Sequence, residues 1–121
     1  MLAHGALLRK NFFSASELIA IVNDFHHAGL TDEEVALMTF AGAITMDAKH
    51  IREQDVQELR RFGLSDAEIL DVVLACTARN FFSKTLDALG AVPDDTYKEL
   101  EPELVEVLAR GRPFPVQVPG G

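Results

Sequence analysis

The chain has 121 residues, which fits a single domain with a modest core. Hydrophobic residues make up 48% of it and charged residues 25%, a composition that excludes intrinsic disorder. The net charge of −8 argues against a nucleic-acid partner, because phosphate binding rests on clustered lysine and arginine. The single cysteine, Cys76, excludes an internal disulfide framework and suits a reducing compartment. No signal peptide or apolar run of membrane-spanning length is present, so we expect a cytoplasmic protein with no membrane partner.

Helix signals follow one another along the whole chain, beginning with a segment that ends in Arg9 and Lys10 and resembles the last turns of a helix. Three S/T-x-x-E capping boxes, at Ser14, Thr31 and Ser65, mark the starts of later helices. No segment shows the sustained alternation of a half-buried strand. The sequence therefore predicts an all-α antiparallel bundle of five to six helices. The predicted helices cover residues 2–10, 14–24, 32–47, 53–62, 66–89 and 103–110.

The helix expected over 66–89 is apolar almost all round between Val72 and Ala78, which predicts neighbours on more than one side. Cys76 lies in this run, so its thiol is expected to be buried and inert. The helical domain is expected to cover 1–111. The prolines and glycines of 112–121 predict an extended or disordered arm.

Few polar residues stand out as candidates for a site. Arg79 and Asn80 interrupt the apolar helix, where they either form an ion pair or an interface, or line a substrate cavity. His26 and His27 are adjacent and diverge on a helix, which favours surface histidines over metal ligands. No metal site, glycine-rich phosphate loop or other cofactor site is predicted.

Three groups of helix motifs, in this order and spacing, resemble the alkylhydroperoxidase D and carboxymuconolactone decarboxylase family, in its peroxidase-related branch. The resemblance covers the chain to about Pro93. It implies the all-α fold of that family, a homo-oligomer and no cofactor. The motifs lie at residues 30–45, 50–69 and 78–90.

The redox site of that family is similar to a CxxC pair with a histidine on the same helix, four positions after the second cysteine. A glutamate lies further upstream. The segment Ala3-His4-Gly5-Ala6 resembles the part that carries the histidine, which implies that His4 is the proton-relay residue. By the spacing of that family, the positions of the cysteine pair and of the glutamate fall before Met1, so the chain as written matches the histidine and lacks the other three residues. As written, the chain is then expected to lack the peroxidase activity of the family, because a thiolate must attack the peroxide. A hydroperoxide and a thiol reductant become partners only if that upstream segment exists.

Three hypotheses about function remain open. The chain belongs to a thiol-dependent peroxidase with a longer N-terminus, or it is a non-catalytic helical oligomerisation or binding module. Alternatively it is a cofactor-free lyase similar to carboxymuconolactone decarboxylase, for which His4 and Arg79 are the candidate pair.

Overall fold

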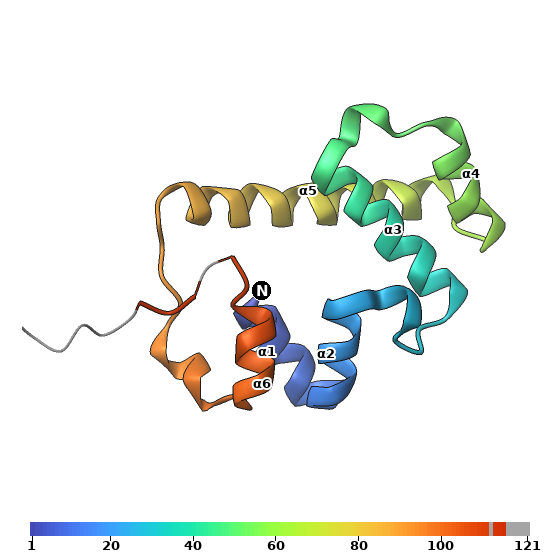
Figure 1. Cartoon of the computed structure of the whole chain (residues 1–121). Helices are drawn as coiled ribbons and strands as arrows, with labels where there is room; N and C mark the ends of the chain where they lie inside the picture. The colour runs from blue at the N-terminus through green and yellow to red at the C-terminus, as the bar shows by residue number, and fades with distance from the viewer. Residues whose placement is uncertain (112, 116–121) are drawn as a thin grey trace, which may run out of the picture. The chain divides into compact units, whose positions relative to one another are not determined.

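The computed structural model describes residues 1–111 and 113–115, and within this part all regular secondary structure is helical, with six α-helices and no strand. The prediction of an all-α fold is therefore confirmed for these residues. The chain divides into two compact units, which are Met1–Ala28 with Ala91–Gly121, and Gly29–Gly90 (Figure 1). The arm predicted for 112–121 falls, apart from 113–115, outside the described residues.

The first unit, formed by the two ends of the chain, is held together by leucines. Leu2, Leu18, Leu104 and Leu108 form its core and are between 0% and 6% exposed. Pro102 occupies the first turn of the last helix, where its missing N–H is not needed. Its helices are α1 (Leu2–Asn11), α2 (Ala15–Asp24) and α6 (Pro102–Leu108), with 3₁₀ turns at Phe25–His27 and Asp95–Glu99.

The second unit is a helical hairpin closed by a shorter helix. Phe40 and Ile44 of the first long helix pack with Leu59 and Ile69, and all four are at most 7% exposed. Leu59, at 1% exposure, makes the short helix part of the core. The helices are α3 (Asp32–Asp47), α4 (Glu53–Arg61) and α5 (Asp66–Ala88), with a 3₁₀ turn at Ala48–His50.

Local hydrogen bonds fix the helix starts where the sequence predicts them. At α5, the backbone N–H of Glu68 donates to Ser65 Oγ at 3.2 Å, and the N–H of Ser65 donates to Glu68 Oε2 at 2.7 Å. The capping boxes at Ser14 and Thr31 are formed in the same way. Arg52 precedes α4 and supplies no side-chain cap, as expected from its residue type, while Asp55 accepts its backbone N–H at 2.7 Å.

Among the described residues, no helix combines the length and the apolar character that crossing a membrane requires.

Candidate functional site

The histidine that the resemblance singles out lies on the first helix of the first unit. His4 is exposed on α1, two residues into the helix. Arg79, its candidate partner for a lyase, lies on α5 and belongs to the second unit. The pairing of these two side chains therefore stays a prediction.

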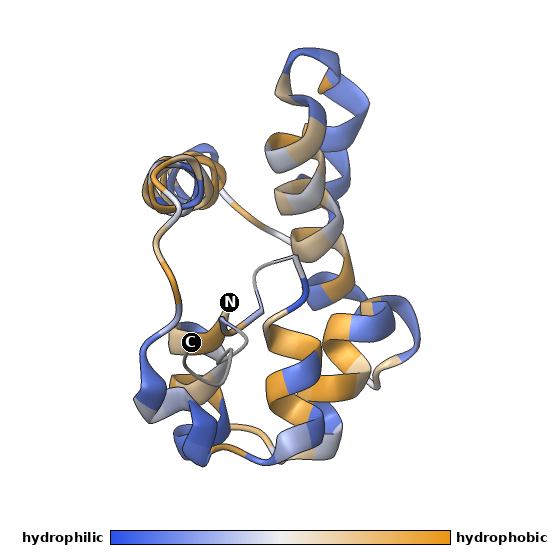
Figure 2. Ribbon diagram, turned by 60° about the vertical axis from the view of Figure 1, so that its left-hand side comes forward, coloured by the Kyte–Doolittle hydropathy of each residue, from blue (hydrophilic) through white to orange (hydrophobic). Residues whose placement is uncertain are grey.

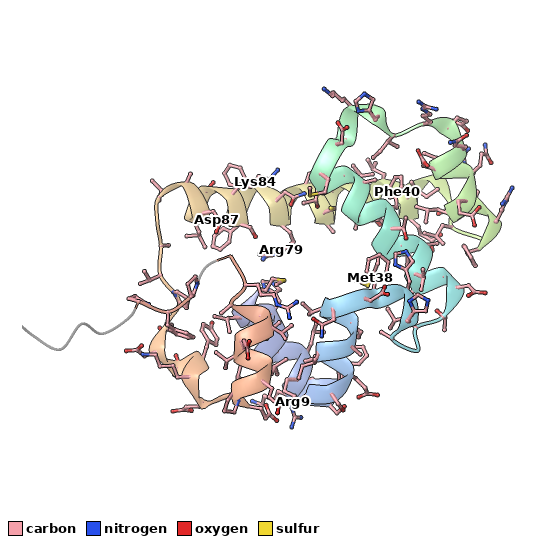
Figure 3. The ribbon with its side chains drawn as sticks, in the orientation of Figure 1. Arg9, Met38, Phe40, Arg79, Lys84 and Asp87 are labelled. Carbon is pink, nitrogen blue, oxygen red and sulfur yellow. The ribbon has the colours of Figure 1, made fainter. Side chains whose placement is uncertain are left out.

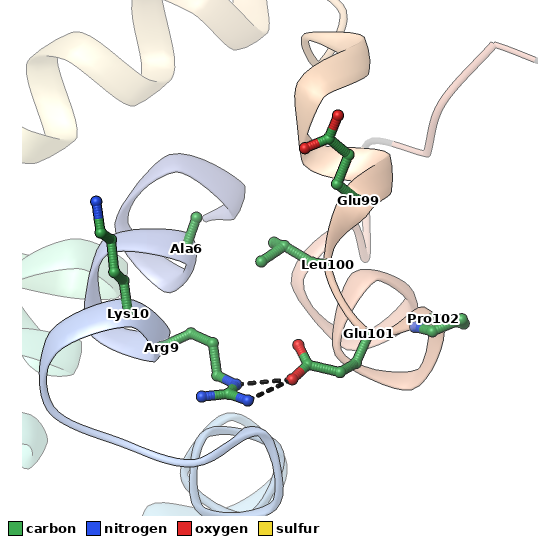
Figure 4. A pocket seen from close by; sticks show the side chains of 7 residues that line it. All are labelled: Ala6, Arg9, Lys10, Glu99, Leu100, Glu101 and Pro102. Carbon is green, nitrogen blue, oxygen red and sulfur yellow. Dashed lines mark hydrogen bonds and ion pairs between the residues drawn. The ribbon is translucent and has the colours of Figure 1, made fainter.

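A concavity of about 540 Å³ lies beside α1 in the first unit (Figure 4). Arg9 lines it and donates to Glu101 Oε1 from Nε at 2.8 Å and from Nη2 at 2.5 Å. The hydrogen bond from Arg9 lowers the pKa of Glu101. Because the guanidinium pairs with this carboxylate, the contact joins α1 to the start of α6.

Asn80 is half-buried in the second unit, whereas its neighbour Arg79, which Figure 3 labels, is exposed. Asn80 Nδ2 donates to Thr45 Oγ1 on α3 at 3.0 Å. Arg79 Nη2 donates to Ser83 Oγ, one turn further along α5, at 3.4 Å. Neither residue lines the concavity beside α1 or a second concavity between α3 and α4.

Cys76 belongs to the same polar cluster between α3 and α5. Its thiol donates to the carbonyl oxygen of Ala41 at 3.4 Å and lies 3.7 Å from both Thr45 Oγ1 and Asn80 Nδ2. Thr45 itself donates to the same carbonyl at 2.9 Å. The sulfur is half-buried and faces a carbonyl oxygen, so the cluster uses the thiol as a hydrogen-bond donor between two helices.

Lys84 completes this face of α5, with Nζ 3.4 Å from the carbonyl oxygen of Thr45 (Figure 3). Cys76, Asn80 and Lys84 are spaced four residues apart, which places them on one face of the helix. That spacing was the available signal for the cluster. No comparable pattern indicated Thr45 on the other helix.

The remaining histidines form local pairs on the surface. His27 Nδ1 lies 2.7 Å from Asp24 Oδ2 and His26 Nδ1 lies 3.3 Å from Oδ1, and the hydrogen bond from His27 is the main cause of the lowered pKa of Asp24. His50 pairs with Asp47 in the same local manner. In the described ranges no three His, Cys, Asp or Glu side chains form a group that could hold a metal ion.

No family model, curated protein or solved structure matches the chain.

The feature that distinguishes α5 is a large apolar surface facing away from its own core. We call it the α5 outer face and define it by five side chains that are between 54% and 78% exposed. At 100° per residue these positions fall within an arc of about 120° on the helix. Figure 2, which views α5 almost along its axis, shows hydrophobic residues on more than one side of it. The five residues are Leu70, Leu74, Phe81, Phe82 and Leu89, the last being the C-cap.

The opposite side of α5 explains why the sequence looks apolar all round. Ile69 is buried there, and Val72, Val73 and Cys76 are partly buried against the core of the second unit. Packing within the unit thus uses one side of the helix and leaves the outer face uncovered. An unpaired surface of this size on a helix is typical of a contact with another molecule.

Proposed function

We propose that this chain is a helical module that assembles with copies of itself through the α5 outer face. The observation that carries the proposal is the exposure of five large apolar side chains along one side of a 23-residue helix. Water in contact with such side chains is unfavourable, and burying each one contributes about 1.5–3 kcal/mol. A second copy offers the same surface, so a two-fold contact covers both faces at once.

The size of the outer face agrees with a contact between subunits. Phe81 and Phe82, at 75% and 55% exposure, would together bury roughly 250 Å² in such a contact. The three leucines add roughly as much again, so apolar atoms alone supply most of the ~800 Å² per partner of a standard interface. Repulsion between like charges opposes this association only weakly, because a single acidic residue of α5, Asp71, falls within the arc of the outer face.

We propose membership of the alkylhydroperoxidase D family on the order and spacing of the helix motifs at 30–45, 50–69 and 78–90. The helical content and the expected homo-oligomer are consistent with it. A cytoplasmic location belongs to the same proposal, because one unpaired cysteine suits a reducing compartment.

Peroxidase chemistry of the CxxC type needs two thiols, one to attack the peroxide and one to resolve the intermediate. This chain has only Cys76, and its sulfur is engaged between two helices. The function we propose for these residues is therefore assembly, and no peroxide turnover is expected from them. The lyase hypothesis rests on the pairing of His4 with Arg79, which stays a prediction.

Light scattering after gel filtration tests the assembly. The unmodified chain should have a mass of at least twice the 13.3 kDa of one copy. Leu74→Glu places a carboxylate within the outer face and should give a monomer with unchanged helix content, because Leu74 is 54% exposed and contributes little to its own core. Met46→Glu is the matched control, since Met46 is 84% exposed on α3 and lies off the outer face.

A monomeric unmodified chain would contradict the proposal, and so would an equal loss of mass in Leu74→Glu and Met46→Glu. Peroxide consumption by the unmodified chain with a dithiol reductant would contradict the absence of turnover. Cys76→Ser separates that activity from trace contaminants, since turnover that depends on this chain must change with its only thiol.

A further inference from the structure

A groove of about 440 Å³ runs between α3 and α4 in the second unit. Its floor is apolar and firmly packed, since Phe40 is 5% and Leu59 is 1% exposed. Val35 and Ala43 continue the floor along α3, and Phe62, at 36% exposure, closes the α4 side. Figure 3 labels Phe40 on α3 and so marks the position of the floor.

The rim of this groove is acidic. Asp32, Asp55 and Glu58 line it, and no lysine, arginine or histidine does. Within the described part of the chain, neither Asp32 nor Asp55 forms an ion pair, while Glu58 pairs with Arg61 at 2.8 Å. The two aspartates also suit the positive N-termini of their helices, and Asp55 accepts the backbone N–H of Arg52, whereas Glu58 lies in the middle of α4 beside Arg61.

The shape of the groove indicates an elongated occupant. Its lining on α3 extends from Asp32 to Ala43, a length of about 16 Å at 1.5 Å per residue. That length corresponds to about three turns of a helix laid along the groove. Grooves of this kind bind amphipathic helices whose apolar side chains recur at i, i+4 and i+7.

We propose that the groove binds a basic amphipathic helix of a partner protein. Its apolar side chains contact Phe40 and Phe62, and its lysines or arginines face the carboxylates of the rim. A second copy of this chain does not suit the groove, because the chain carries a net charge of −8 and its long helices begin with acidic turns. The site is independent of the α5 outer face, since all its lining residues lie on or directly after α3 and α4.

Fluorescence anisotropy with the full chain and a labelled synthetic peptide tests the proposal. The peptide is a three-turn helix with leucine and phenylalanine on one side and lysine on the other. It should bind saturably and more weakly as salt is added. Asp32→Asn with Glu58→Gln should weaken binding about tenfold, the effect of losing two exposed ion pairs.

Two further variants separate the groove from the general charge of the protein. Glu33→Gln removes a neighbouring carboxylate that does not line the groove, and should change binding by less than about twofold. Thr39→Arg projects a long cation into the groove from an exposed lining position and should abolish binding while the helix content stays the same.

Four results would overturn the proposal. They are the absence of peptide binding, equal binding of a peptide with glutamate in place of lysine, equal weakening by Glu33→Gln and by the double variant, and binding unaffected by Thr39→Arg. If a simple alkylammonium ion bound as tightly as the peptide, the groove would be a site for a small cation and not for a helix, which would also contradict the proposal.

Discussion

Gly5 offers a sharp test of the packing in the first unit. It is buried on α1, and a Cβ added there would lie 2.4 Å from Cδ1 and 2.8 Å from Cδ2 of Leu108 on α6. Carbon atoms in favourable contact are about 3.5–4.0 Å apart, so Leu108 would have to move. Its freedom to move is small, because it is 5% exposed in a core with three other leucines.

Two opposing effects set the magnitude for Gly5→Ala. Alanine is favoured over glycine inside a helix by about 1 kcal/mol, whereas overpacking a core costs about 1–3 kcal/mol. We expect a net loss of about 1 kcal/mol in the free energy of unfolding, a decrease of about 4 °C in Tm for a chain of 121 residues. Gly42→Ala is the matched control on α3, since its Cβ would meet no atom within 4 Å, and it should stabilise by about 1 kcal/mol.

Urea unfolding, followed by circular dichroism, measures the free energy of unfolding of both variants. Leu108→Ala, alone and combined with Gly5→Ala, completes a double-mutant cycle. In the Leu108→Ala background the clash is removed, so Gly5→Ala should become stabilising, with a coupling of about 2 kcal/mol between the two sites. If Gly5→Ala stabilises the unmodified protein as much as Gly42→Ala does, the packing of α1 against α6 is wrong.

Three other predictions concern the caps and the cysteine. Ser65→Ala removes the acceptor of the Glu68 N–H and should cost about 1 kcal/mol by urea unfolding; no measurable loss would contradict the cap. Hydrogen bonds from Ser65 lower the pKa of Glu68, so the unfolded chain binds more protons than the folded one at acidic pH. The stabilisation from this carboxylate is therefore complete above the unfolded pKa, near 4.5, and is lost as the pH falls through the lowered folded value. The stability difference between the unmodified chain and Glu68→Gln should accordingly shrink as the solution is acidified, and a constant difference would refute the assignment. Cys76 should react with an aromatic disulfide reagent more slowly in the folded chain than in urea, and equal rates would show that its contact with Ala41 does not form.

The helix boundaries could be predicted because their causes are local. A hydroxyl residue and a glutamate three positions later satisfy each other's backbone N–H groups, and the helices starting after Ser14, Thr31 and Ser65 begin as predicted. Gly63 ends α4 with φ of +89°, a conformation that glycine adopts without strain. Short 3₁₀ turns such as Asp95–Glu99 were missed, since they have no apolar period of their own.

The arrangement of side chains between helices was less accessible. Apolar residues around α5 predicted neighbours on several sides, but periodicity does not tell which side packs within the chain and which stays exposed. The contact of Asn80 with Thr45 joins positions 35 residues apart, and only the packing of α3 against α5 brings them together. The groove between α3 and α4 was missed for the same reason, because its lining comes from two helices whose relative position no local pattern specifies.

Sedimentation equilibrium of the unmodified chain, over a range of concentrations, tests the proposed assembly most directly. Our account predicts a mass that rises with concentration to a fixed multiple of 13.3 kDa, as two or more copies cover the α5 outer face. A mass of 13.3 kDa at every concentration would contradict it.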